Sequence, residues 1–156
     1  MMLSDNKSNE PVRVSARKEA RLLLEIFKCS QVLQREINPA LRGFGLKYQQ
    51  FVVLDEIIWN GPITQKMVCE TLLFEKSNIS KIVKLLLDKQ LIQLTTFPGD
   101  RRSTLLSETS EGVRLWRQCV EAFNNLRNGY FDMLAEDEIA EIMRVIKKIQ
   151  KGLQQR

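Results

Sequence analysis

Apolar residues recur every three or four positions through the first part of this chain. The pattern predicts a helix over 12–38, which Asn38 and Pro39 should stop, and a second helix over 46–59. Each helix carries a continuous apolar stripe. We therefore expect each of them to pack against another element rather than stand alone in solvent.

The middle of the chain predicts three further elements in quick succession. Thr64 is a candidate N-cap for a short helix, and Ser77 is a candidate N-cap for a longer one over 77–89, with a turn between them. After Gln90 the helical spacing of apolar residues ends. Two runs rich in β-branched residues and leucine follow, which is typical of strands, and Pro-Gly-Asp at 98–100 separates them. This block predicts a helix-turn-helix followed directly by a β-hairpin.

Two more helices are predicted after the hairpin. One begins at Thr109 and runs to around Gly129, and the last covers 137–155, with apolar residues at steps of three and four from Ile139 to Leu153. So narrow a stripe suits pairing with another helix, either in the same chain or in a second copy. The fold class predicted is mainly α (α+β), a winged helix-turn-helix with flanking N- and C-terminal helices.

The flanking helices have little within one chain to cover their apolar stripes, so we expect them to form a homodimer. The domain organisation follows in chain order: a flexible N-terminus (1–11), an N-terminal dimerisation helix (12–45), a winged helix-turn-helix DNA-binding domain (46–108) and C-terminal dimerisation helices (109–156).

Composition narrows the function further. With 156 residues and 44% hydrophobic content the chain is long enough for one domain with a substantial core, and its net charge of +5 favours an anionic partner. The absence of histidine excludes histidine-based triads and imidazole metal sites. Without an activating histidine or a paired-thiol motif, a thiol enzyme is disfavoured. We expect no enzymatic activity, no cofactor and no metal.

The three cysteines and the N-terminus bear on location. Cys29 falls on the apolar stripe of the first helix and is predicted to be a buried structural thiol, and Cys69 and Cys119 also look packed. Three separated thiols suit a reducing compartment. The chain has no apolar run approaching the ~18 residues of a membrane span, and its start lacks the apolar core of a signal peptide. We expect a cytoplasmic protein with no membrane contact.

The predicted helix over 77–89 has a polar face that is free of acids from Lys76 to Leu87. Short polar side chains near a helix N-terminus can approach base edges in a major groove, and lysines further along can reach phosphates. An ordinary solvated helix face would have a similar composition. The neighbouring elements favour the first interpretation, because the block 62–107 carries seven bases against four acids, a surplus of three.

Five stretches of the sequence resemble the MarR family of bacterial transcriptional regulators. They are LKYQQFVVLDEI, GPITQ, KSNISKIVKLL, PGDRRS and TSEG, and the resemblance covers roughly residues 46–116. Its most specific element is an Asp-x-Arg in the hairpin, formed by Asp100 and Arg102. The chain departs from the family pattern at Gln90, where glycine is common, and at Leu94, where arginine is common.

The resemblance implies a homodimer that presents two winged helix-turn-helices to a pseudo-palindromic operator in double-stranded DNA. The recognition helix (77–89) would enter the major groove, and the wing (96–103) would place an arginine in the adjacent minor groove. We expect a sequence-specific regulator that acts as a repressor. The candidate DNA-binding residues are Thr64, Gln65, Lys76, Ser77, Asn78, Ser80, Lys81, Lys84, Asp100, Arg101 and Arg102.

The resemblance also makes a small aromatic effector a candidate partner, because many relatives bind one between the dimerisation and DNA-binding parts. The residues that would line such a crevice are Phe44, Tyr48, Phe51, Trp59 and Trp116. Aromatic residues at helical spacing also suit a plain core. The alternative function for the whole chain is a helical protein-interaction adaptor that uses the winged domain to bind a partner protein.

Overall fold

The computed structural model describes residues 10–97, 100–126 and 132–155. Within these ranges, the side chains of 10–16, 97, 100–103, 126 and 153–154 are not described. The chain divides into two compact units, residues 1–36 and 37–156, which are described separately below.

The first helix, α1 (Glu10–Gly43), leaves its apolar stripe exposed in the single chain. The exposed apolar side chains of α1 are Leu22, Leu23, Leu24, Ile26, Phe27 and Val32. The Cys29 thiol is exposed as well, so the expectation that this cysteine is buried is wrong for the single chain. The sequence pattern identified this apolar stripe correctly.

The predicted end of the first helix is also wrong, because α1 continues through Pro39 to Gly43. A proline inside a helix removes one backbone hydrogen bond, and this normally ends or kinks the helix. Here the extra turn buries Leu41 completely in the core of the second unit. We infer that burial of this side chain offsets the lost hydrogen bond.

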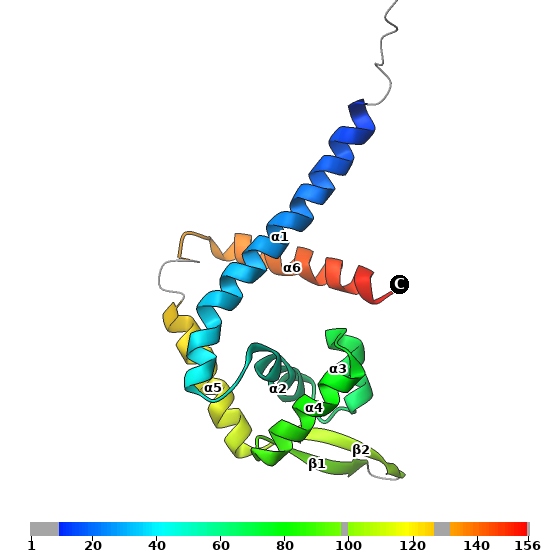
Figure 1. Cartoon of the computed structure of the whole chain (residues 1–156), viewed down its shortest axis with the longest axis vertical. Helices are drawn as coiled ribbons and strands as arrows, with labels where there is room; N and C mark the ends of the chain where they lie inside the picture. The colour runs from blue at the N-terminus through cyan, green and yellow to red at the C-terminus, as the bar shows by residue number, and fades with distance from the viewer. Residues whose placement is uncertain (1–9, 98–99, 127–131, 156) are drawn as a thin grey trace, which may run out of the picture. The chain divides into compact units, whose positions relative to one another are not determined.

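The second unit contains a mainly helical fold with one two-stranded antiparallel sheet (Figure 1). Its elements are α2 (Tyr48–Asn60), α3 (Gln65–Leu72), α4 (Lys76–Asp88), β1 (Ile92–Phe97), β2 (Asp100–Glu108), α5 (Ser110–Leu126) and α6 (Glu136–Gln154). In chain order α2–α3–α4–β1–β2 is a winged helix-turn-helix, as the sequence predicts. Its core includes the fully buried Leu54, Ile57, Val68, Ile79 and Leu86.

The helix-turn-helix is formed by α3 and α4, which pack against each other and against α2. Thr64 caps α3 as expected, and its hydroxyl accepts a hydrogen bond from the backbone N–H of Met67 at 3.2 Å. The expected cap at Ser77 is wrong, because α4 begins one residue earlier, at Lys76. The N-cap position is held by Glu75, whose side chain makes no capping hydrogen bond.

A short antiparallel bridge on the outer side of β2 connects the hairpin to the helix-turn-helix. β1 pairs antiparallel with β2, with Leu94 opposite Leu106. On the other side of β2, Ile63 and Leu106 exchange two backbone hydrogen bonds of 3.0 and 2.7 Å. Because Ile63 lies directly before the cap of α3, the start of the helix-turn-helix and the base of the wing are joined through their backbones.

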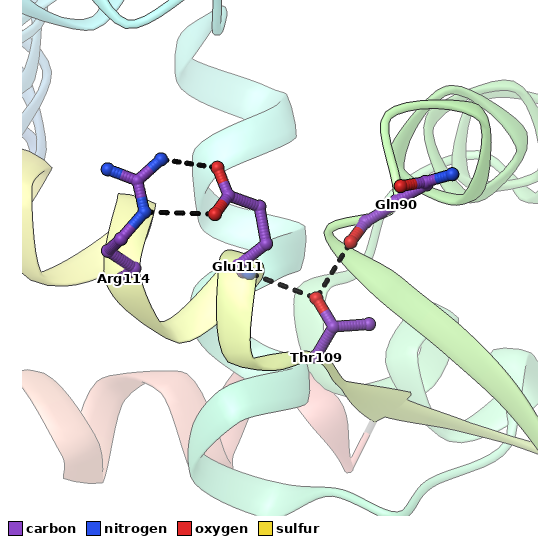
Figure 2. A network of polar contacts seen from close by, with 5 residues as sticks. Gln90, Thr109, Glu111 and Arg114 are labelled. Atoms are coloured by element: carbon purple, nitrogen blue, oxygen red, sulfur yellow. Dashed lines mark hydrogen bonds and ion pairs between the residues drawn. The ribbon is translucent and has the colours of Figure 1, made fainter.

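A second connection joins the end of α4 to the start of α5 (Figure 2). The Thr109 hydroxyl donates to the carbonyl of Gln90 at 2.7 Å and accepts from the backbone N–H of Gly112 at 3.0 Å. The backbone N–H of Thr109 donates to the carbonyl of Leu91 at 3.2 Å. Thr109 therefore both caps the start of α5 and holds it against the turn that follows α4.

Gln90 adopts a left-handed backbone conformation with φ 58°, which explains why glycine is common at this position in the family that the sequence resembles. A residue with a Cβ atom is strained there, whereas glycine is not. We expect Gln90→Gly to raise the free energy of unfolding by about 0.5–1 kcal/mol, measured by urea denaturation. Lys81→Gly, at an exposed position inside α4, is the control and should lower it. A Gln90→Gly variant no more stable than the native chain would contradict the strain at this turn.

Candidate nucleic-acid interface

One face of α4 is buried in the core and the opposite face is free. Ile79, Ile82, Val83 and Leu86 are buried. Ser77, Ser80, Lys81 and Lys84 are exposed, and Lys76 is exposed at the start of the helix. The helix thus presents a polar and cationic stripe over its first three turns, as expected from the sequence.

The cations on this stripe differ from neighbouring lysines in their partners. Among the described residues, Lys76, Lys81 and Lys84 form no ion pair. By contrast, Lys66 on α3 lies 3.7 Å from Glu70, and the Lys89 ammonium donates to the carbonyl of Gly45 at 3.1 Å. Lysines without ion-pair partners on one helix face attract a polyanion. Their contacts with phosphates do not cost the free energy of breaking an internal ion pair.

Two short polar side chains of α4, the exposed Ser80 and the half-buried Asn78, form hydrogen bonds with neighbouring helices. The Gln65 amide of α3 donates to the Ser80 hydroxyl at 2.7 Å, and the Asn78 amide donates to Gln49 of α2 at 3.2 Å. Gln49 was not among the residues that the sequence singled out. It is exposed and lies 29 residues from its partner, so no local pattern could have identified it.

The wing residues are placed only through the backbone. Asp100, Arg101 and Arg102 are the first residues of β2, at the tip end of the hairpin, and their side chains lie outside the described part of the structure. The Pro98–Gly99 turn also lies outside the described residues. The hairpin nevertheless follows α4 directly, which is the order required for a wing.

The aromatic residues proposed to line an effector crevice mostly pack with the core. Phe51 is buried against Phe123 with ring centroids 5.0 Å apart, and Trp116 donates to Asp55 at 2.7 Å. Phe44 and Tyr48 are half-buried against the same core. The exception is Trp59, which is 69% exposed and stands edge-on to Trp116 at 5.9 Å.

The described residues also bear on thiol reactivity, metal binding and membrane crossing. Burial raises the pKa of the Cys119 thiol to about 11, so this group is protonated and unreactive near neutral pH. No three His, Cys, Asp or Glu side chains in the described ranges gather into a metal-binding cluster. None of the described helices is both long and apolar enough to cross a membrane.

The second helix of the helix-turn-helix, α4, has an exposed cationic face without ion-pair partners among the described residues. Together with α2, α3 and the hairpin, this face defines a winged helix-turn-helix protein of the nucleic-acid-binding class. Comparison with known proteins shows what this part of the chain is similar to. A sequence model described as "MarR family" matches residues 44–103. Over its winged helix-turn-helix the chain is therefore similar to the MarR family of transcriptional regulators.

Individual proteins are similar over more of the chain. The chain is 27% identical over 125 residues to the multiple antibiotic resistance protein MarR of Salmonella typhimurium, covering 80% of this chain and 87% of that protein. Its fold is similar to that of a putative MarR family regulator from Listeria monocytogenes complexed with a 26mer DNA, with TM-score 0.75, 21% identity and coverage of 85% and 89%. It is also similar to CouR from Rhodococcus jostii bound to p-coumaroyl-CoA, with TM-score 0.74, 22% identity and coverage of 83% and 91%.

Proposed function

We propose that this protein is a homodimeric transcriptional regulator, acting as a repressor in the cytoplasm, that binds a pseudo-palindromic site in double-stranded DNA. The observation that carries the proposal is the exposed face of α4, on which Lys76, Lys81 and Lys84 have no ion-pair partner among the described residues. A face of this kind on the second helix of a helix-turn-helix suits a major groove, with lysines reaching the flanking phosphates. The DNA complex of the Listeria relative supports the same use of this fold.

The dimer in this proposal is formed by the apolar stripes that the single chain leaves exposed. On α6 these include Ile142, Ile146 and Ile149, which return at helical spacing. A two-fold dimer would place the two α4 helices about 34 Å apart, one turn of the duplex. In the wing, Arg102 is assigned to the minor groove, Asp100 to its orientation, and Arg101 to phosphate.

Binding to DNA fragments from upstream of the protein's own gene tests the proposal. The regulator should shift a fragment in a gel with an affinity that falls steeply as salt rises, because each phosphate contact releases counterions. If no fragment shifts at any ionic strength, the winged domain has another use, and the adaptor that binds a partner protein becomes the better hypothesis.

Lys84→Ala should weaken binding to all duplexes alike and reduce the slope of log affinity against log salt by about one unit. The reason is that Lys84 lies one turn beyond the short polar residues of α4 and has no ion-pair partner among the described side chains. Affinities of specific and unrelated duplexes, titrated at several salt concentrations, measure the effect. Lys148→Ala makes the same charge change on α6 and should leave the slope unchanged. A loss confined to one base position would instead make Lys84 a base-reading residue.

An aromatic effector is a second part of the proposal. CouR binds p-coumaroyl-CoA, and in this chain Trp59 is the member of the aromatic set whose ring is largely free to stack on a ligand. Trp116 lies edge-on to Trp59, whereas Phe44, Tyr48 and Phe51 pack with the core. A phenolic carboxylate should quench tryptophan fluorescence and weaken DNA binding in parallel, and Trp59→Ala should abolish both effects.

A further inference from the structure

A three-member hydrogen-bond chain connects α3 to the exposed face of α4. The Gln65 amide nitrogen lies 2.7 Å from the Ser80 hydroxyl oxygen, and that oxygen lies 3.0 Å from the carbonyl oxygen of Lys76, one turn earlier on α4. Gln65 is the first residue of α3, directly after the Thr64 cap. Its side chain therefore starts from a fixed point and bridges the two helices of the helix-turn-helix.

The direction of both hydrogen bonds follows from the chemistry of the groups. A carbonyl oxygen can only accept, and a serine hydroxyl has a single hydrogen to donate. The Ser80 hydrogen is therefore used on the Lys76 carbonyl, and the Gln65 amide must turn its N–H, not its oxygen, toward Ser80. A hydroxyl oxygen has two acceptor positions. One of these is occupied by Gln65, and one is left.

The remaining acceptor position lies on the exposed face of the helix. Ser80 is exposed and is flanked by Lys81 and Lys84, both of which are also exposed. A free serine could turn its hydroxyl to suit either a donor or an acceptor in the groove. Ser80 cannot do so without breaking its bond to the Lys76 carbonyl, because its only hydrogen is already engaged.

We propose that Gln65 is a positioning residue that holds Ser80 as a hydrogen-bond acceptor, and that Ser80 thereby selects a base with an amino group in the major groove. This inference rests on the proposed DNA-binding function. In the major groove adenine presents its N6 amino group and cytosine its N4 amino group as donors, whereas guanine presents O6 and N7, and thymine O4, as acceptors. Each half-site should therefore contain one position where adenine or cytosine is preferred over guanine or thymine on the strand that Ser80 faces.

The test is a selection from a pool of duplexes with a random segment of about 30 base pairs, which leaves room for two half-sites one helical turn apart. The full-length native chain should enrich a pseudo-palindrome with one such adenine-or-cytosine position in each half. Ser80→Ala should make that position indifferent, a loss of roughly threefold to tenfold in discrimination for one hydrogen bond. Gln65→Leu should weaken the preference at the same position and leave the other positions unchanged.

Gln49→Leu is the matched control, because it removes a hydrogen bond of the same kind, 3.2 Å long, to Asn78 on the same helix. It should leave the Ser80 position unaffected. Affinity for unrelated duplex at low salt and the midpoint of thermal unfolding distinguish positioning from a structural role. Both should stay at the native values in Gln65→Leu, since the side chain it removes supports one reading group rather than the fold.

Each outcome decides the question. A uniform loss of affinity in Gln65→Leu with the base preference intact would make Gln65 a phosphate contact, and the inference would be wrong. A Ser80-dependent position that selects guanine or thymine would reverse the polarity argued above. If a palindrome is enriched that Ser80→Ala leaves unchanged, the inference fails while the proposed function stands. If the native chain enriches nothing, both fail.

Discussion

A chain that carries Ile142→Glu together with Ile146→Glu should sediment as a single chain and lose about 100-fold or more of its affinity for operator DNA. The two isoleucines lie one helical turn apart on α6, and their side chains are 45% and 44% exposed in the single chain. A carboxylate buried at an apolar helix interface without a partner is strongly unfavourable, so the dimer should dissociate. One winged domain then binds its half-site without help from the other.

Analytical ultracentrifugation and a DNA titration at one fixed salt concentration measure the two parts of this prediction. The matched control is Ala140→Glu with Lys151→Gln, which changes the net charge by the same two units on the opposite face of α6. This control should remain dimeric and keep most of its DNA affinity. If the isoleucine variant stays dimeric at micromolar concentration, the α6 stripe is not the subunit interface, and α1 must supply it.

Gly112→Ala should lower the free energy of unfolding by about 1–3 kcal/mol, toward the upper end of that range. A Cβ atom at position 112 would overlap the carbonyl oxygen of Leu91 and come within 2.9 Å of its carbonyl carbon. The obstacle is backbone rather than a flexible side chain, so it cannot turn aside. Relief requires the start of α5 to move away from the hairpin, which would strain the hydrogen bonds of Thr109.

Urea denaturation followed by circular dichroism, at one protein concentration for all variants, measures this change. Gly152→Ala is the control, because no atom lies within 4 Å of a Cβ placed there. Alanine inside α6 should instead stabilise the protein by about 0.5–1 kcal/mol. A Gly112→Ala variant as stable as the native chain would show that the contact between α5 and residue 91 can open without loss.

Much of the fold could be predicted from the sequence because its signals are local. The buried stripe of α4 and the Thr64 cap both depend on residues within one or two helical turns. One of the two errors at helix ends has a non-local cause, because Pro39 is tolerated where Leu41 reaches a core built from distant residues. The start of α4 at Lys76 rather than after Ser77 has no structural explanation.

The site is less predictable than the fold for the same reason. Exposed lysines on α4 follow from the period of its apolar residues, but their lack of ion-pair partners is a property of the surrounding surface. The bond from Gln65 to Ser80 spans 15 residues and depends on the angle between two helices. The exposure of Cys29 could not be predicted either. An apolar stripe in the sequence indicates that a helix packs against something, but it does not indicate whether the partner is the same chain or a second copy.

The paired backbone hydrogen bonds between Ile63 and Leu106 limit how this protein can be regulated. They join the base of the wing to the residue before the cap of α3, so a movement of the wing base should also move α3. The wing and the helix-turn-helix of one chain should therefore move together as one unit. In the proposed dimer, a signal that weakens DNA binding would then act on the spacing or tilt between the two winged domains rather than on the junction of residues 63 and 106.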